Sequence, residues 1–223
     1  MECLYFWKSN IHYLNKKKLP IFYLNQAEDY ALAIWKIEED IAFFPSSIYY
    51  NQQITHPQKK LQHLAGRYLL SILEPDFPYQ LMQVNTASKP YIPNFHKHFS
   101  ISHCKQFAAA VISKNTCGID VEIVNEKMQV IKHKFAHASE IRWVNSLPCN
   151  IQPLALTIIW SAKEALYKWW GNGEVDFKEH LRIMPFVIAN NEKIEAAFLH
   201  PKHQQHCTLQ VHIFEETVMV FLV

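Results

Sequence analysis

Glycine is scarce in this chain of 223 residues, of which only four are glycine. The scarcity excludes the glycine-rich phosphate loops of the Walker and dinucleotide-binding types. The five cysteines are odd in number and widely spaced, and no Cys-x-x-Cys pair occurs. This pattern argues against a disulfide scaffold and against a cysteine-based zinc site. If the protein binds phosphate, we therefore expect side chains and a metal ion to hold it.

The chain also lacks a strong net charge and a long hydrophobic run. Lys and Arg together number 22, and Asp and Glu together number 20, so there is no overall field of the kind that attracts nucleic acid. No stretch is long and apolar enough to span a membrane, and residues 1–8 combine an early acid with an apolar run too short for a signal peptide. We expect a cytoplasmic protein with no membrane segment and no nucleic-acid partner.

What the chain does have is a hydrophobic content of 49%, enough to bury a real core in one large domain or two small ones. Apolar periodicity predicts a similar order of elements in both halves. In the first half we expect strands over 30–37, 99–102 and 107–112 and a helix over 57–73. In the second half we expect strands over 118–124, 208–214 and 217–223, a helical region over 130–145 and a helix over 157–170.

The similar order in the two halves indicates a diverged internal duplication. We expect an N-terminal lobe over residues 1–114 and a C-terminal lobe over residues 115–223. Small-molecule pockets commonly lie at such interfaces, so the active site is expected in the cleft between the lobes.

Two short stretches carry the candidate chemistry. In the first, Asp120 and Glu122 alternate with apolar residues, so both carboxylates leave one face of the predicted strand, about 7 Å apart. Such a pair needs a proton, a counter-ion or open water, and a hard cation is one good solution. In the second, Glu164 and Lys168 share one face of the predicted helix. Taken alone, the first pattern also fits the solvent-exposed face of a strand, and the second also fits a surface ion pair. Together they suggest a magnesium-dependent site for a diphosphate substrate.

Further motifs occur in a fixed order around these two stretches. The full set is Ser88-Lys89-Pro90-Tyr91, Phe99-Ser100-Ile101-Ser102-His103, Gly118-Ile119-Asp120-Val121-Glu122 and Trp160-Ser161-Ala162-Lys163-Glu164-Ala165-Leu166-Tyr167-Lys168. With these motifs the chain resembles the 4′-phosphopantetheinyl transferase superfamily, of the long, two-lobed Sfp type, over roughly residues 57–188. The resemblance implies an α+β fold: two similar α/β lobes related by pseudo-two-fold symmetry, each with an antiparallel sheet packed by helices. It also implies a monomer.

The resemblance further implies a reaction. Enzymes of this family transfer the 4′-phosphopantetheine arm from coenzyme A to a serine of an apo acyl or peptidyl carrier protein and release adenosine 3′,5′-bisphosphate. By similarity, Asp120, Glu122 and Glu164 would hold Mg²⁺, for which Mn²⁺ could substitute. Asp120, Glu164 and Lys168 would be catalytic, with Glu164 as general base and Lys168 at the leaving phosphate.

The resemblance also implies a set of residues that bind coenzyme A. His103 and Lys163 would contact its phosphates, and Lys89 would reach the 3′-phosphate of its ribose. The chain departs from the family pattern at Gln62, where a basic residue often reaches this 3′-phosphate. Lys59, Lys60 and Arg67 are candidates to replace it, and each fits equally well as a solvated surface charge.

Two other classes of function stay open at this point. Three carboxylates and several basic groups also fit another magnesium-dependent phosphotransferase or a phosphohydrolase. A non-catalytic, coenzyme A-binding member of the fold is the other alternative, although such a protein need not keep Asp120, Glu122, Glu164 and Lys168. The identity of the carrier protein is left open.

Overall fold

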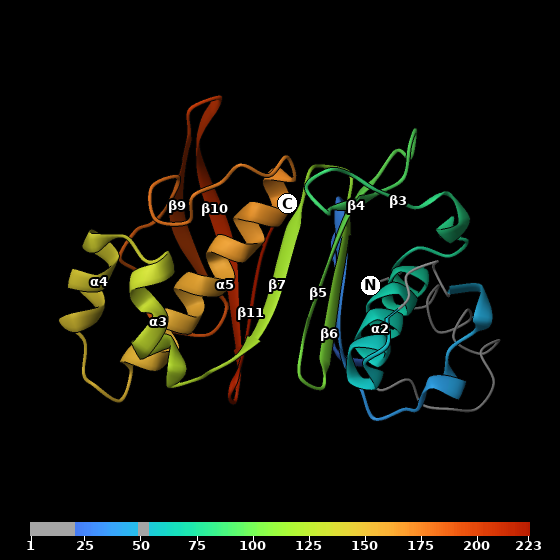
Figure 1. Cartoon of the computed structure of the whole chain (residues 1–223), viewed down its shortest axis with the longest axis horizontal. Coiled ribbons are helices and arrows are strands. Elements are labelled where there is room, and N and C mark those ends of the chain that lie inside the picture. The colour runs from blue at the N-terminus through green and yellow to red at the C-terminus, as the bar shows by residue number, and fades with distance from the viewer. Residues whose placement is uncertain (1–20, 49–53) are drawn as a thin grey trace.

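The structure, a computed structural model, describes residues 21–48 and 54–223. Residues 1–20 of the predicted N-terminal lobe, Cys3 among them, lie outside the described residues. Two antiparallel sheets stand side by side at the centre of the molecule (Figure 1). None of the helices in the described ranges is long and apolar enough to cross a membrane.

The first sheet has four strands in the order β1-β2-β6-β5. These strands are β1 (Ile21–Gln26), β2 (Tyr30–Lys36), β6 (Phe107–Ser113) and β5 (His98–Cys104). Helix α2 (Pro57–Leu73) covers one face of this sheet. It begins with proline in its first turn, where no backbone N–H is needed, and it buries Leu64, Leu69 and Leu70 against the sheet. Among the described residues, this part of the chain also contains three short 3₁₀ turns (Ile41–Phe43, Ser46–Ile48 and Tyr79–Leu81) and the pair β3 (Gln83–Val84) and β4 (Pro90–Tyr91).

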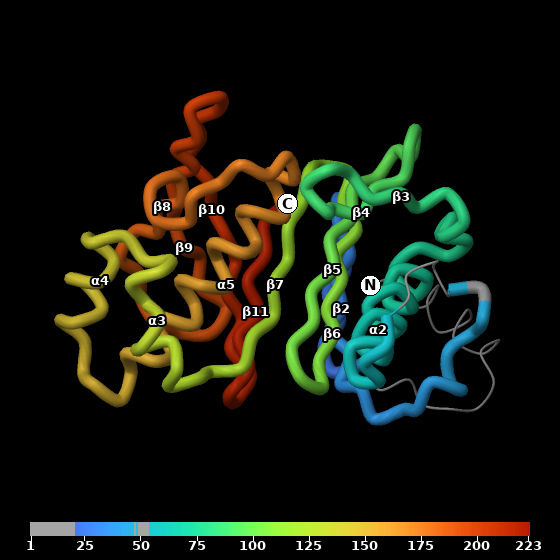
Figure 2. Tube along the Cα trace, viewed as in Figure 1, coloured from blue at the N-terminus to red at the C-terminus, as the bar shows by residue number. Residues whose placement is uncertain are grey.

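The second sheet has five strands in the order β7-β11-β10-β9-β8. These strands are β7 (Gly118–Ile123), β11 (Thr217–Leu222), β10 (His203–Phe214), β9 (Glu192–His200) and β8 (Leu181–Ile183). The long helix α5 (Gln152–Trp170) packs on β7 and β11, and α3 (Lys127–Phe135) and α4 (Ala138–Asn145) lie outside it (Figure 2). Helix α5 ends at Gly171, whose left-handed backbone (φ 68°) closes the last turn.

The inner faces of the two sheets form one shared core. Alternate residues of β2 and β6, such as Leu32 and Val111, pack with Ile119 and Val121 of β7 and with Phe221 of β11. The helices therefore cover the outer faces, and the central strands are buried on both sides. This burial explains why several central strands are nearly continuous apolar runs in the sequence.

Strands β5 and β7 run side by side where the sheets meet (Figures 1 and 2). They are joined through side chains: Ser100 Oγ accepts a hydrogen bond from the backbone N–H of Ile119 (3.2 Å), and Ser102 Oγ accepts one from that of Val121 (3.3 Å). The edge of β7 is thereby paired, as a buried sheet edge must be.

The predicted α+β fold of antiparallel sheets packed by helices is confirmed. The predicted helical region over 130–145 is two helices, because His137 begins α4 with a capping box. The backbone N–H of His137 donates to Glu140 (2.7 Å), and the His137 ring accepts from the N–H of Ser139 (3.1 Å). Strands β1, β3, β4, β8 and β9 were not predicted. The division into lobes 1–114 and 115–223 as separate units stays a prediction.

Candidate active site

A cavity of about 310 Å³ lies where β5, α5 and the segment 87–90 meet. Its walls include Ser88, Lys89 and Pro90 from the first lobe, Phe99, Ser100 and Ile101 from β5, and Glu164, Tyr167, Lys168 and Gly171 from α5 and its end. The cavity thus brings together residues from three of the four sequence motifs.

Gly118 allows the close contact of β7 with α5 that builds one wall of the site. A Cβ atom at this position would lie 2.0 Å from the carbonyl oxygen of Ala165 and 2.8 Å from the backbone nitrogen of Trp169. Both neighbours are backbone atoms, so no change of side-chain rotamer can relieve the clash. Only glycine therefore lets β7 come near enough for Asp120 to meet Lys168.

Asp120 is the centre of a buried ionic group. Its side chain is 4% exposed, and its Oδ1 accepts from Lys168 Nζ (2.6 Å) and from Ser102 Oγ (2.7 Å). Lys168 Nζ also donates to Ser102 Oγ (2.9 Å). The second oxygen, Oδ2, is buried and finds no hydrogen-bond partner within residues 21–48 and 54–223. Burying a carboxylate oxygen without a hydrogen-bond partner costs free energy of desolvation. Binding of a cation or a hydrogen-bond donor at Asp120 Oδ2 would therefore be favourable.

Glu122 and Glu164 are half-buried near Asp120. Burial is the main cause that raises the pKa of Glu122, and the charge of Asp120 raises it further. Trp160 Nε1 donates to Glu122 Oε1 (3.1 Å). Burial, followed by the charges of Asp120 and Glu122, raises the pKa of Glu164 to about 7, and Lys168 partly offsets this rise. Two carboxyl groups whose pKa values are raised by burial and by a neighbouring carboxylate are the electrostatic signature of a cation or proton-transfer site.

Within the described part of the chain, no three His, Cys, Asp or Glu side chains form a group that could hold a metal ion by themselves. The donor set nevertheless suits Mg²⁺, because this ion prefers carboxylate oxygens and takes several ligands from water and substrate. The partnerless Asp120 Oδ2 and the raised pKa of Glu164 are both features that a divalent cation would relieve.

Lys89 lies in the wall of the cavity and reaches across to the second lobe. Its Nζ donates to the carbonyl oxygen of Trp169 (3.2 Å), and burial lowers the pKa of its ammonium group. Asn85 fixes the turn that carries it: Asn85 Oδ1 accepts from the N–H of Lys89 (2.8 Å), and Asn85 Nδ2 donates to the carbonyl oxygen of Gly171 (2.7 Å).

His103 sits near the end of β5, on the α2 side of the ionic group. Loss of solvent around its ring is the main cause that lowers its pKa, and the nearby positive charge of Lys168 lowers it further, with a smaller contribution from Arg67. Gln62 of α2 donates to the carbonyl oxygen of Lys105 (2.7 Å) and so holds the turn that follows β5. Arg67, a candidate to replace the basic residue expected at Gln62, therefore lies close enough for its charge to affect His103.

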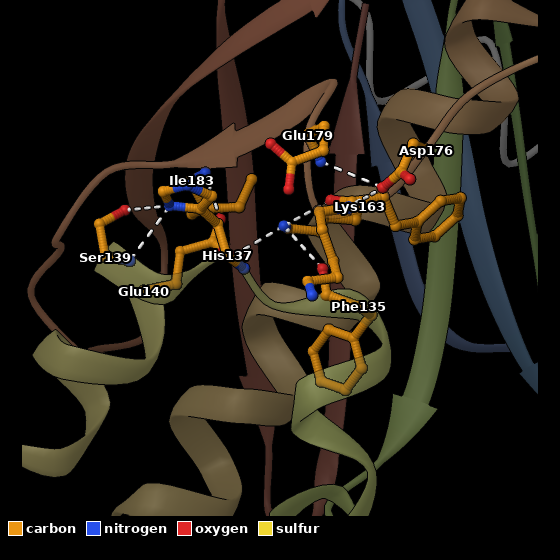
Figure 3. Close-up of polar contacts among 10 residues, drawn as sticks. Phe135, His137, Ser139, Glu140, Lys163, Asp176, Glu179 and Ile183 are labelled. Carbon is orange, nitrogen blue, oxygen red and sulfur yellow. Dashed lines mark hydrogen bonds and ion pairs between the residues drawn. The ribbon is translucent and has the colours of Figure 1, made fainter.

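The structure contradicts the prediction that Lys163 contacts phosphates of coenzyme A. Its side chain is 0% exposed, and its ammonium group is enclosed by Glu140 (2.7 Å) and the carbonyl oxygens of Phe135 (3.0 Å) and Phe177 (2.7 Å) (Figure 3). Consecutive residues of an α-helix point about 100° apart. Since Glu164 faces the cavity, Lys163 is turned into the core of the second lobe.

Ser102 and Trp160 belong to the sequence motifs, but no role was predicted for either residue. Ser102 links Lys168 to Asp120, and Trp160 binds Glu122. The position of Ser102 could have been predicted, because Ser100 and Ser102 alternate with Ile101 and so share one face of a strand. For Trp160 the sequence offered only its position four residues before Glu164, on the same helix face.

Comparison with known proteins shows what the second half of the chain is similar to. Residues 116–221 match the family model described as the 4′-phosphopantetheinyl transferase superfamily. The second half of the chain is therefore similar to this superfamily, as the motifs suggested. The Sfp type within it stays a prediction.

Curated relatives match about half of the chain. Enterobactin synthase component D of Salmonella austin is 32% identical over 114 residues, which cover 50% of this chain and 47% of the relative. The protein of the same name from Salmonella typhi is 31% identical over 122 residues, covering 50% and 48%. The one from Escherichia coli (strain K12) is 29% identical over 136 residues, covering 59% and 63%. The chain thus spans roughly half to three fifths of the length of these relatives.

Proposed function

We propose that the protein transfers the 4′-phosphopantetheine arm from coenzyme A to a serine of an apo acyl or peptidyl carrier protein, with Mg²⁺, and releases adenosine 3′,5′-bisphosphate. The observation that carries the proposal is the buried group of Asp120, Lys168 and Ser102, with Glu164 beside it on the wall of the cavity. As the family resemblance implies, we expect a cytoplasmic monomer.

In this reaction the serine oxygen of the carrier attacks the pantetheine-bearing phosphorus of the diphosphate. The bond from this phosphorus to the bridging oxygen breaks, and that oxygen leaves with adenosine 3′,5′-bisphosphate. Glu164 takes the proton of the serine, the role that the family resemblance implies for it. Lys168 offers positive charge to the leaving phosphate.

Asp120, Glu122 and Glu164 would hold Mg²⁺, or Mn²⁺ in its place. Bound there, the ion supplies charge neutralisation to the diphosphate. Lys89 and His103 would bind phosphates of coenzyme A through charge-assisted hydrogen bonds. Lys163 has no part in this set, because its ammonium group is enclosed elsewhere.

The test is incubation of the purified protein with coenzyme A, Mg²⁺ and a panel of apo carriers, followed by mass spectrometry of each carrier. The panel includes carriers of fatty-acid, polyketide and peptide-synthetase type. An increase in mass equal to one phosphopantetheine arm in at least one carrier supports the proposal. If the Asp120→Ala and Glu164→Ala variants no longer produce this increase, the proposed roles of these residues are supported. Release of phosphate from a simple ester without any carrier gain would favour a phosphohydrolase. Binding of coenzyme A without either reaction would favour a non-catalytic member of the fold.

A further inference from the structure

Lys163 and Glu140 form a buried ion pair (Figure 3). The Lys163 ammonium group makes three contacts: to Glu140, to the carbonyl oxygen of Phe135 and to that of Phe177. Since an ammonium group has three hydrogens, its donor capacity is fully used. Nothing is left with which it could bind a phosphate.

Glu140 is equally occupied. In addition to Lys163, it accepts from the backbone N–H of His137 (2.7 Å) and from that of Ile183 (2.7 Å). The pair therefore ties α5 to the end of α3, the start of α4 and strand β8. A buried ion pair adds little net stability compared with apolar packing of the same shape, but its hydrogen bonds fix the groups that they join.

The two carbonyl groups that Lys163 holds belong to residues that pack on Trp160. The ring centroids of Phe135 and Trp160 are 5.2 Å apart, and those of Phe177 and Trp160 are 5.6 Å apart. Trp160 in turn donates to the carboxylate of Glu122. The same three aromatic side chains line an open groove that also contains Glu164. A chain of contacts thus runs from Lys163 through the two phenylalanines to Trp160 and Glu122.

We propose that Lys163 is a positioning residue, which holds Phe135 and Phe177 so that Trp160 keeps the carboxylate of Glu122 in place. Its effect on catalysis rests on the function proposed above. Its effect on Trp160 does not, because it can be measured without any substrate.

The experiment combines a spectroscopic signal with steady-state kinetics. Protein labelled with 5-fluorotryptophan gives a ¹⁹F resonance for Trp160, which the Trp160→Phe variant assigns. The variants are Lys163→Met, Trp160→Phe and the combination of the two. Because Lys163→Met leaves Glu140 buried without its cation, Lys163→Met/Glu140→Gln is measured in parallel and keeps the test valid if the single variant does not fold. Lys193→Met, at an exposed site on β9, is the matched control.

We expect Lys163→Met, or its double variant with Glu140→Gln, to shift the Trp160 resonance. We also expect kcat to fall about 10–100-fold, the usual loss when a supporting hydrogen-bond partner is removed, with the KM for coenzyme A changed by less than about twofold. Trp160→Phe should lower kcat by about tenfold or more, within that same range. The combined Lys163→Met/Trp160→Phe variant should lose no more than the worse single variant, because both lie on one chain of contacts.

Two results would overturn the inference. A raised KM for coenzyme A with an unmoved Trp160 resonance would mean that Lys163 contacts the substrate. If the fold-decrease in kcat of the combined variant equals the product of the two single fold-decreases, Lys163 and Trp160 act independently. If the wild-type protein modifies no carrier, the proposed function fails, and the resonance of Trp160 alone still decides whether Lys163 positions it.

Discussion

Replacing Glu164 by glutamine should make the folded protein more stable at alkaline pH. Burial and the charges of Asp120 and Glu122 raise the pKa of this carboxyl from 4.5 to about 7. Since one pKa unit is worth about 1.4 kcal/mol, ionising Glu164 in the folded state costs up to about 3 kcal/mol relative to the unfolded chain. Glu164→Gln keeps the shape of the side chain and removes the charge.

The sign of the effect follows from the direction of the shift. A carboxyl with a raised folded pKa binds its proton more tightly in the folded state. The destabilisation of the folded state by ionised Glu164 is therefore fully present above pH 7, decreases as the pH falls from 7 to 4.5, and is absent below 4.5. We expect Glu164→Gln to exceed the wild type by about 2–3 kcal/mol in free energy of unfolding at pH 8, with little difference near pH 4.5.

Urea denaturation at several pH values, in the presence of a chelator, measures this difference. The chelator matters because a bound cation would relieve the same repulsion as a proton. Glu216→Gln, an exposed carboxyl in the turn between β10 and β11, is the control and should show no pH-dependent gain. A gain for Glu164→Gln that is the same at pH 5 and pH 8, or a loss of stability at pH 8, would refute the reasoning.

Three further substitutions test other parts of the site. Lys168→Met leaves Asp120 buried without its ion pair, so it should lower the free energy of unfolding by about 3 kcal/mol and slow arm transfer strongly; a loss below about 1 kcal/mol in urea denaturation would contradict the pairing. Lys89→Ala should raise the KM for coenzyme A while leaving kcat nearly unchanged, and the defect should disappear with a donor that lacks the 3′-phosphate; an equal defect with both donors would show that Lys89 contacts another group. Gly118→Ala drives a methyl group into the backbone at Ala165, so thermal unfolding should reveal a loss of about 3 kcal/mol or more, and wild-type stability would mean that β7 and α5 can separate freely.

The sequence predicted best those elements whose burial leaves a plain pattern. Helix 57–73 matches α2 at both ends, because its apolar face is regular and proline starts it. The runs at β2, β6 and β11 were recognisable because both faces of these strands are covered. Strand β9 was missed, since only one of its faces is buried and exposed residues such as Glu195 and Leu199 interrupt it.

The candidate site was partly readable for a similar reason. A strand has a period of two, so Asp120 and Glu122 had to share a face. A helix spacing of four likewise put Glu164 and Lys168 together. What the sequence could not supply was the rotation of α5 against the sheet, which turns Glu164 toward the cavity and Lys163 into the core. That choice depends on Glu140, Phe135 and Phe177, which come from segments outside the motif.

The contacts that join the two sheets are also the contacts that build the site. Ser102 of β5 accepts from the backbone N–H of Val121, accepts from Lys168 and donates to Asp120. One hydroxyl therefore pairs the edge of β7 and completes the ionic group. Docking of β5 on β7 and placement of Asp120 cannot be varied separately, because moving either strand breaks both sets of bonds. Any substitution that loosens the contact between the two sheets should accordingly reduce the function of the site, even where it touches no substrate.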